Sequence, residues 1–243
     1  AYMQSLIQEA IRGSRFNRTE LARRAGVSAS TISRIEKGSI DPTLGMAEKI
    51  LAATGLQIAP RLEPLSDPEA LRAARAILGD DGDTAADTEG AATLRRWASP
   101  DGTPRPRALA REAGPAAPPR LRPGAVELST GWNFLRICST AAATREGWAV
   151  SGSPAAERIG APEATGPVIL YVQSPQRIER MLASSGPGPH QVLILPFDGT
   201  SETGAWNDEG IVWADPIQVI LDCYGLPEAT GQAEELTKDW ERQ

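Results

Sequence analysis

Four short helical segments, separated by glycines, fill the first sixty residues and limit this part of the chain to a small all-α fold. Apolar residues recur there at intervals of three and four, which predicts amphipathic helices. Gly26 and Gly38 are placed to end the second and third helices, because glycine readily adopts the left-handed backbone of a helix C-terminus. Ser28 precedes the third helix as a candidate N-cap. The positions expected in the core are Leu6, Ile7, Ala10, Ile11, Leu21, Ala22, Ala25, Ile32, Ile35, Leu44, Ala47, Ile50 and Leu51.

The second and third segments have the proportions of a helix-turn-helix, in which two short helices meet at a glycine-containing turn of about three to four residues. The sequence from Asn17 to Gly38, NRTELARRAGVSASTISRIEKG, resembles the Cro/CI-type (XRE) family of DNA-binding domains. Pro42-Thr43-Leu44 and Ala52–Leu56 fit the same family. The resemblance implies that the third helix enters the major groove of double-stranded DNA and that the second helix crosses the backbone above it.

The resemblance divides the candidate DNA contacts into two groups. Arg34 is the best candidate base reader, because its guanidinium group matches O6 and N7 of guanine. The groove-facing positions expected to read bases are Ala29, Ser30, Ser33 and Arg34. The residues expected to contact phosphates, and so to set the register, are Asn17, Arg18, Ser28, Thr31 and Lys37. The family often has Gln at the position of Ala29, and this departure leaves the target sequence open.

Two further interpretations concern the charged residues of this segment. Arg23 and Arg24 would form a solvated face if the segment were an ordinary helical bundle. Glu36 is expected to orient Arg34 or to cap the turn, a structural role and not a DNA contact.

The net charge of the chain is −6, with a sequence pI near 5.0, which taken alone argues against binding to nucleic acid. The charge is unevenly distributed, however. Residues 1–60 hold 8 Lys/Arg and 5 Asp/Glu, whereas the remaining 183 residues hold 17 and 26. The chain therefore has a basic N-terminal part, with a local charge of +3, that can approach phosphates.

Other classes of protein are disfavoured by composition. No run of eighteen apolar residues is present and the opening residues lack a signal-peptide pattern, so we expect a cytoplasmic protein with no membrane partner. Cys138 and Cys223 are expected to pack in the interior and not to sense redox state. His190 follows Gly186-Pro187-Gly188-Pro189 and is expected in a loop without a chemical role. We expect no metal, no cofactor and no catalytic residues.

Residues 63–126 are interpreted as a linker region with local helix, rich in proline and arginine. Helices are predicted over Glu69–Leu78 and Ala91–Trp97. Asp80-Asp81-Gly82-Asp83 is predicted to be a solvated acidic loop, because the rest of a calcium-binding loop is missing. The alternative for Pro106–Gly114 is the remnant of a winged helix, a second DNA-binding element.

Residues 127–243 alternate between strand and helix patterns, which predicts an α/β domain with a small sheet. The expected strands are Trp148–Val150, Val168–Val172, Val192–Leu195 and Ile211–Trp213. The expected helices are Leu135–Arg145, Pro175–Ser184, Pro216–Tyr224 and Gln232–Trp240. Asp222 falls on the apolar face of one of these helices and is expected either to cap or to pair internally.

Two weaker resemblances concern this domain. Gly152-Ser153, between a strand and a helix, resembles the opening of a nucleotidyltransferase fold, but the strand Val168–Val172 lacks the Asp-x-Asp that holds Mg²⁺. Ala214–Asp222 and Ala233–Leu236 resemble the C-terminal part of AbiEi-type antitoxins, which join a DNA-binding domain to a degenerate domain of this kind.

The predicted fold is multidomain α+β: a helix-turn-helix domain at 1–62, the linker region at 63–126, and an α/β dimerisation or sensor domain at 127–243. The predicted function is a transcriptional regulator, a repressor that binds its operator as a homodimer, with antitoxin-like autoregulation as the sharper version. A toxin partner or a small-molecule effector would bind the C-terminal domain. The alternative is a nucleotidyltransferase-like or nucleotide-binding enzyme with a DNA-targeting domain.

Overall fold

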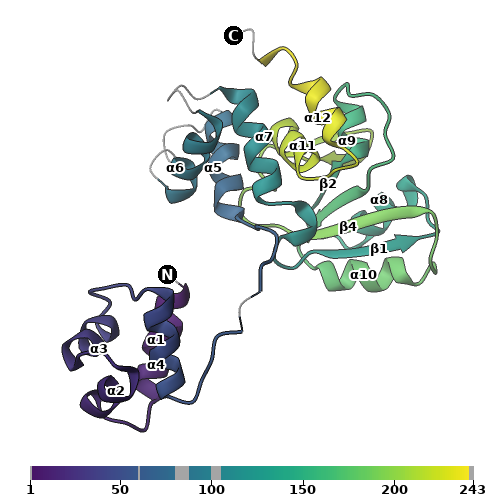
Figure 1. Cartoon of the computed structure of the whole chain (residues 1–243). Coiled ribbons are helices and arrows are strands. Elements are labelled where there is room, and N and C mark those ends of the chain that lie inside the picture. Colours follow the sequence, from purple (N-terminus) through teal and green to yellow (C-terminus); the bar gives the residue numbers. More distant parts are fainter. Residues whose placement is uncertain (1, 60, 80–87, 100–104, 241–243) are drawn as a thin grey trace. The chain divides into compact units, whose positions relative to one another are not determined.

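The computed structural model describes residues 2–59, 61–79, 88–99 and 105–240. The chain divides into two compact units, residues 1–63 and 64–243 (Figure 1). Residues 100–104 and the acidic stretch Asp80-Asp81-Gly82-Asp83 lie outside the described residues. Within the described residues, no helix combines the length and the apolar character needed to cross a membrane.

The first unit consists of four helices whose ends are fixed by local side chains. These helices are α1 (Tyr2–Gly13), α2 (Arg18–Ala25), α3 (Ala29–Glu36) and α4 (Leu44–Ala53). Asn17, Ser28 and Thr43 cap α2, α3 and α4, each accepting a hydrogen bond from a backbone N–H of the first turn. Gly26 ends α2 with a φ of 67°, the left-handed conformation that the sequence predicts there.

The core of this unit is close to the predicted set. Its largest fully buried side chains are Ile7, Ile11, Leu21, Ile32, Ile35 and Ile50. The prediction was wrong for Leu6 and Leu44, which are 39% and 57% exposed. Leu6 lies outside the buried stripe of Ile7 and Ile11 on α1, and Leu44 is the first residue of α4. Four short helices bury only one stripe of each helix surface.

The second unit contains a mixed six-stranded sheet with the strand order β1-β4-β3-β2-β6-β5. The strands are β1 (Val126–Thr130), β2 (Trp148–Gly152), β3 (Val168–Val172), β4 (His190–Pro196), β5 (Trp206–Asp208) and β6 (Ile211–Trp213). β3 runs parallel to β4 and β2 runs parallel to β6, while the other neighbours are antiparallel. The central strand β3 is buried on both faces, as its continuous apolar sequence predicts.

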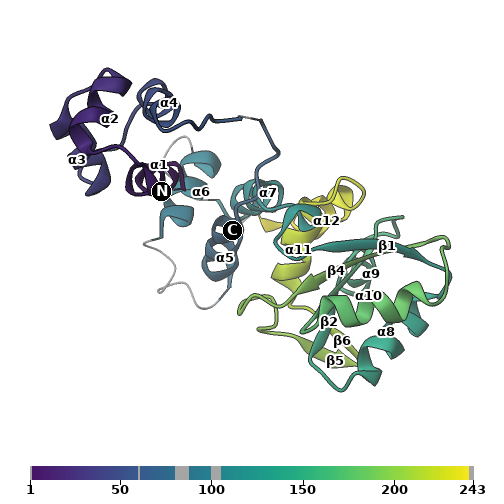
Figure 2. The same ribbon diagram turned by 90° about the horizontal axis from the view of Figure 1, so that it is seen from below.

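Helices cover both faces of this sheet (Figure 2). On one face lie α8 (Phe134–Ala143) and α10 (Pro175–Ala183), which contact each other. On the other face α9 (Ser153–Arg158) and α11 (Pro216–Tyr224) pack against β2, and α12 (Thr230–Leu236) packs against both of them. The sequence therefore predicts the helices and the inner strands correctly.

Some local predictions differ from the structure. β1 and β5, the two edge strands, were missed, because one is only half-buried and the other has three residues. The last helix ends at Leu236 and not at Trp240. The loop prediction for His190 was wrong, because this exposed residue begins β4 and pairs with Thr130 of β1.

The stretch predicted as a linker region carries three helices that share the core of the sheet. They are α5 (Pro68–Leu78), α6 (Glu89–Ala98) and α7 (Pro106–Ala116), followed by the 3₁₀ helix η1 (Pro119–Leu121). Pro68 and Pro106 stand in the first turns of their helices, where the missing N–H costs nothing. Alanine-rich faces on all three helices allow close packing, and α7 lies against α11.

Candidate nucleic-acid interface

The first turns of α2 and α3 are stabilised by side chains that the sequence assigned to phosphate contacts. Oδ1 of Asn17 accepts a hydrogen bond from the backbone N–H of Glu20 at 2.9 Å. Oγ of Ser28 accepts one from the N–H of Thr31 at 3.1 Å and lies 2.7 Å from the Thr31 hydroxyl. Asn17, Ser28 and the half-buried Thr31 therefore shape the helix-turn-helix itself. The amide nitrogen of the exposed Asn17 makes none of these bonds and remains available to a phosphate oxygen.

The predicted base readers share one helix and are mostly accessible. Ala29, Ser30 and Arg34 are exposed on α3, while Ser33 is half-buried. The hydroxyl of Ser30 lies 2.8 Å from that of Ser28. Among the described residues, nothing forms a hydrogen bond or ion pair with the guanidinium group of Arg34. Its donors are thus free to bind an external acceptor, and the edge of guanine offers two acceptors in suitable geometry.

Arg18 and Lys37, the two charged phosphate candidates, have different surroundings. Arg18 begins α2 and forms an ion pair with Glu36 at the end of α3, with Arg18 Nε 3.0 Å from Glu36 Oε2. The hydrogen bond from Arg18 lowers the pKa of the Glu36 carboxyl, and the same bond raises the pKa of Arg18. Lys37 follows α3 as its C-cap and is exposed. Glu36 has the structural role that the sequence predicts, but the expectation that it orients Arg34 was wrong, because Glu36 pairs with Arg18.

A second acidic residue organises the remaining arginines of α2. Oε1 of Glu20 lies 2.6 Å from Nη2 of Arg23 and 3.1 Å from Nε of Arg24. The hydrogen bond from Arg23 is the main cause that lowers the pKa of Glu20 to about 2. Arg23 and Arg24 are exposed, as expected for a solvated face, but they share the single carboxylate of Glu20, which compensates one of their two charges within α2. Their spacing of three and four residues from Glu20 is the sequence signal for these pairs.

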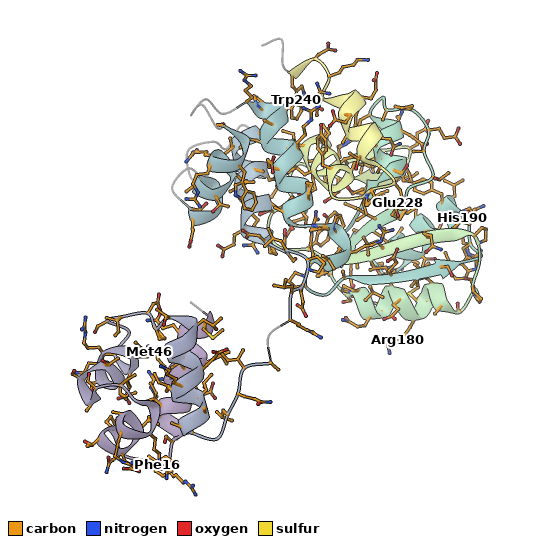
Figure 3. All side chains as sticks on the ribbon, viewed as in Figure 1. Phe16, Met46, Arg180, His190, Glu228 and Trp240 are labelled. Atoms are coloured by element: carbon orange, nitrogen blue, oxygen red, sulfur yellow. The ribbon has the colours of Figure 1, made fainter. Side chains whose placement is uncertain are left out.

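Sequence reasoning missed the role of Phe16. Phe16 lies at the edge of the first unit (Figure 3). The centroid of its ring is 4.0 Å from the guanidinium carbon of Arg24 and 4.9 Å from that of Arg15. Phe16 directly precedes the N-cap Asn17, a position where an apolar residue often fixes the direction of the chain into a helix. The ring thus holds two cations beside the start of α2.

The nucleotidyltransferase-like motif of the second unit does not form an open phosphate site. Ser153 is 1% exposed, and its hydroxyl donates to the carbonyl of Ala164 at 3.2 Å. The helix α9 that follows has only six residues. A nucleoside triphosphate could not reach this hydroxyl unless the loop that carries Ala164, between α9 and β3, moved away.

The internal pairing expected for Asp222 is confirmed. Its carboxylate is fully buried and accepts hydrogen bonds from Ser151 at 2.6 Å and from Tyr171 at 3.0 Å. Arg122 Nη1 lies 2.7 Å from Asp222 Oδ1, and Gln218 donates to the same oxygen at 3.0 Å. This polar cluster joins η1, the sheet and α11 in the interior, and has no opening toward a substrate.

Comparison with known proteins identifies one segment of the chain, in its first unit. Residues 9–60 match the helix-turn-helix family model, a span that includes α2, the turn and α3. Neither the curated proteins nor the solved structures contain a match to the chain. The N-terminal unit is therefore a helix-turn-helix of the XRE type, and the chain is a DNA-binding transcription regulator. The AbiEi-like resemblance of the C-terminal part gains no support and stays a prediction.

Proposed function

We propose that this protein is a sequence-specific repressor that places α3 in the major groove of its operator. The observation that carries the proposal is the exposed guanidinium group of Arg34, which pairs with none of the described residues and lies on the recognition helix of a helix-turn-helix with capped helices. Ala29, Ser30 and Ser33 would line the same groove, and Asn17, Arg18, Ser28, Thr31 and Lys37 would contact phosphates.

A homodimer fits this function best. One helix-turn-helix buries little DNA surface, whereas two of them about 34 Å apart meet successive major grooves on one side of the duplex. The second unit would supply dimerisation and binding of an effector or a toxin partner in the cytoplasm. Antitoxin-like control of its own operon is the sharper form of this proposal, and it rests on the resemblance of Ala214–Asp222 and Ala233–Leu236 alone.

Selection of bound sites from a random DNA pool tests the proposal directly. A repeated motif with two half-sites about 10 base pairs apart would support a dimeric operator-binding protein. Recovery of sequences without a shared motif would contradict sequence-specific recognition. Recovery of a motif with a single half-site would support sequence-specific binding but would contradict the proposed dimer.

We assign no catalytic role to the chain. The enzyme alternative is less favoured because Ser153 is buried and β3 carries no acidic residue. Calorimetry with nucleoside triphosphates and Mg²⁺ separates the two proposals, since binding with turnover would overturn ours.

A further inference from the structure

A cavity of about 870 Å³ lies within the second unit, between α5, the loop 198–205 and the N-terminal end of α11. Its volume is in the range of about 300–1,000 Å³ that is usual for sites that bind small molecules. The cavity includes none of the residues expected to contact DNA and none of the buried cluster around Asp222. The cavity is therefore separate from both of these groups of residues.

One wall of the cavity is held in place by Arg75 of α5. The side chain of Arg75 is 9% exposed, and its Nη2 lies 3.1 Å from both Asp215 Oδ2 and the carbonyl oxygen of Thr203. Its buried Nε has no hydrogen-bond partner among the described residues. Gly204 allows this close packing, because a Cβ at that position would lie 2.3 Å from Asp215 Oδ2. Arg75 thus ties α5 to the loop and to α11, so that the cavity is formed before a ligand arrives.

A second arginine, Arg72, offers its charge to the cavity. It lies one turn before Arg75 on α5 and its side chain is 45% exposed. The nearest carboxylate oxygen, Oδ2 of Asp198, is 4.0 Å from Arg72 Nε, which is too far for a hydrogen bond. The other oxygen of Asp198 accepts bonds from the N–H groups of Thr200 and Ser201 at 3.0 and 2.8 Å. Arg72 is therefore a cation whose donors are not used within the described residues.

Apolar side chains complete the walls. Ala76 lies one turn after Arg72 on α5, and Ala73 lies three positions before Ala76, so that both alanines line the cavity beside Arg72. Leu78 and Ile217 add larger apolar surfaces from the end of α5 and the first turn of α11. The polar part of the lining includes Thr88, Thr200 and Thr203 and the carboxylates of Glu69 and Asp215, of which Asp215 pairs with Arg75. The cavity thus combines apolar side chains with an exposed cation, Arg72, at its edge.

We propose that this cavity binds a small organic anion, with an apolar body against Ala73, Ala76 and Ile217 and an anionic group on Arg72. A planar guanidinium forms paired hydrogen bonds with either a carboxylate or a phosphate group. The binding site rests on the cavity alone, whereas its role as an effector site rests on the proposed function.

Two fluorescent probes that differ mainly in charge test the proposal on the full chain. The probe 8-anilino-1-naphthalenesulfonate carries an anionic group, and N-phenyl-1-naphthylamine has a similar apolar body without charge. We expect one molecule of the anionic probe to bind, and Arg72→Gln to weaken its binding about tenfold, as for a lost hydrogen bond to a charged group. Binding of the neutral probe should stay unchanged in this variant. Benzoate and phenyl phosphate, used as competitors, distinguish the two kinds of anionic group.

Two further variants define where the probe binds. Ala76→Phe fills the cavity and should weaken both probes. Arg180→Gln removes an exposed arginine from α10, outside the cavity, and should change neither probe (Figure 3). Equal binding of the anionic probe to the native protein, Arg72→Gln and Ala76→Phe would overturn the proposal. Because these measurements contain no DNA, they stay informative even if operator binding is disproved.

Discussion

Arg18 and Glu36 join the first residue of α2 to the last residue of α3, with Arg18 Nε 3.0 Å from Glu36 Oε2. A second contact, between Arg18 Nη2 and Glu36 Oε1, makes this ion pair bidentate. The ion pair spans the turn and fixes the two helices of the DNA-binding motif relative to each other. It also places a carboxylate beside a cation that we expect to meet a phosphate.

Glu36→Gln should therefore strengthen binding to DNA of any sequence. The substitution removes the negative charge beside Arg18, which also repels the phosphate that we expect Arg18 to contact. We expect the slope of log K against log salt to become steeper by less than about one unit, because the proposed contact of Arg18 with a phosphate is already made by the native protein. Arg18→Ala should do the opposite, weakening all sequences about equally and flattening the slope by about one unit. Fluorescence anisotropy with an unrelated duplex at several salt concentrations measures both effects.

Glu48→Gln is the matched control, because Glu48 is exposed on α4 and its loss changes the net charge of the unit equally. If both glutamine variants steepen the salt dependence to the same degree, the effect comes from net charge and not from release of Arg18. If Arg18→Ala instead changes base preference, Arg18 reads sequence.

Arg34→Ala should weaken binding to the selected operator by about 1–3 kcal/mol and relax specificity at one base pair. The guanidinium is exposed on α3, and no described residue competes for its donors. Titration of the operator and of its single-base variants separates the loss of affinity from the loss of discrimination. Lys49→Ala removes an exposed cation from α4 and should leave discrimination intact. Unchanged operator affinity in Arg34→Ala would disprove the assigned register of the recognition helix.

Arg122→Met should destabilise the second unit by about 3–5 kcal/mol, because it leaves the buried Asp222 carboxylate without its cation. Urea unfolding followed by tryptophan fluorescence reports this unit selectively, since all six tryptophans follow residue 63. Arg120→Met removes a partly exposed arginine that pairs with Glu127 and Glu228. This control should cost about 1 kcal/mol or less. Equal losses in the two variants would show that burial of the Arg122–Asp222 pair carries no special cost.

The helix-turn-helix could be predicted because its determinants are local in sequence. Asn17 and Ser28 each cap the helix that directly follows, and Gly26 ends α2. The pair between Arg18 and Glu36 was missed because nothing in a single sequence indicates which of several arginines a glutamate meets across a turn. The same limit applies to Asp222, whose burial follows from its helix face but whose partner Arg122 stands a hundred positions earlier.

Residues 64–126 show a different limit. The prolines of this stretch predict a linker, yet Pro68 and Pro106 stand in the first turns of helices. The faces of these helices carry alanines and glycines, which give a weak hydrophobic pattern but permit close contact between backbones. Gly114 is the clearest case, because α11 approaches α7 at this position.

Gly114→Ala tests this packing and should destabilise the second unit by about 1–3 kcal/mol. The added Cβ would lie 2.4 Å from Tyr224 Cβ and 2.7 Å from the carbonyl oxygen of Leu221, so that α7 and α11 must move apart. Gly231→Ala on α12 is the control, because a Cβ there meets no atom within 4 Å. We expect this control to be neutral or stabilising by up to about 1 kcal/mol. Unfolding curves that coincide for Gly114→Ala and the native protein would mean that α7 does not pack on α11 in solution.

The two thiols should be unreactive in the native protein. Burial raises the pKa of Cys138 to about 12, and burial together with the neighbouring Asp222 charge also raises the pKa of Cys223. Because the thiolate is the reactive form, modification by Ellman's reagent at about pH 8 should be roughly a thousandfold slower than in urea. The unfolded chain loses its thiol protons near pH 8.5 while the folded chain keeps them, so that the free energy of unfolding should fall as the pH rises from about 8.5 to 12. A Cys138→Ala, Cys223→Ala double variant should show a shallower decline over this interval. Rapid modification of either thiol in the native protein would contradict their burial and reopen a redox role.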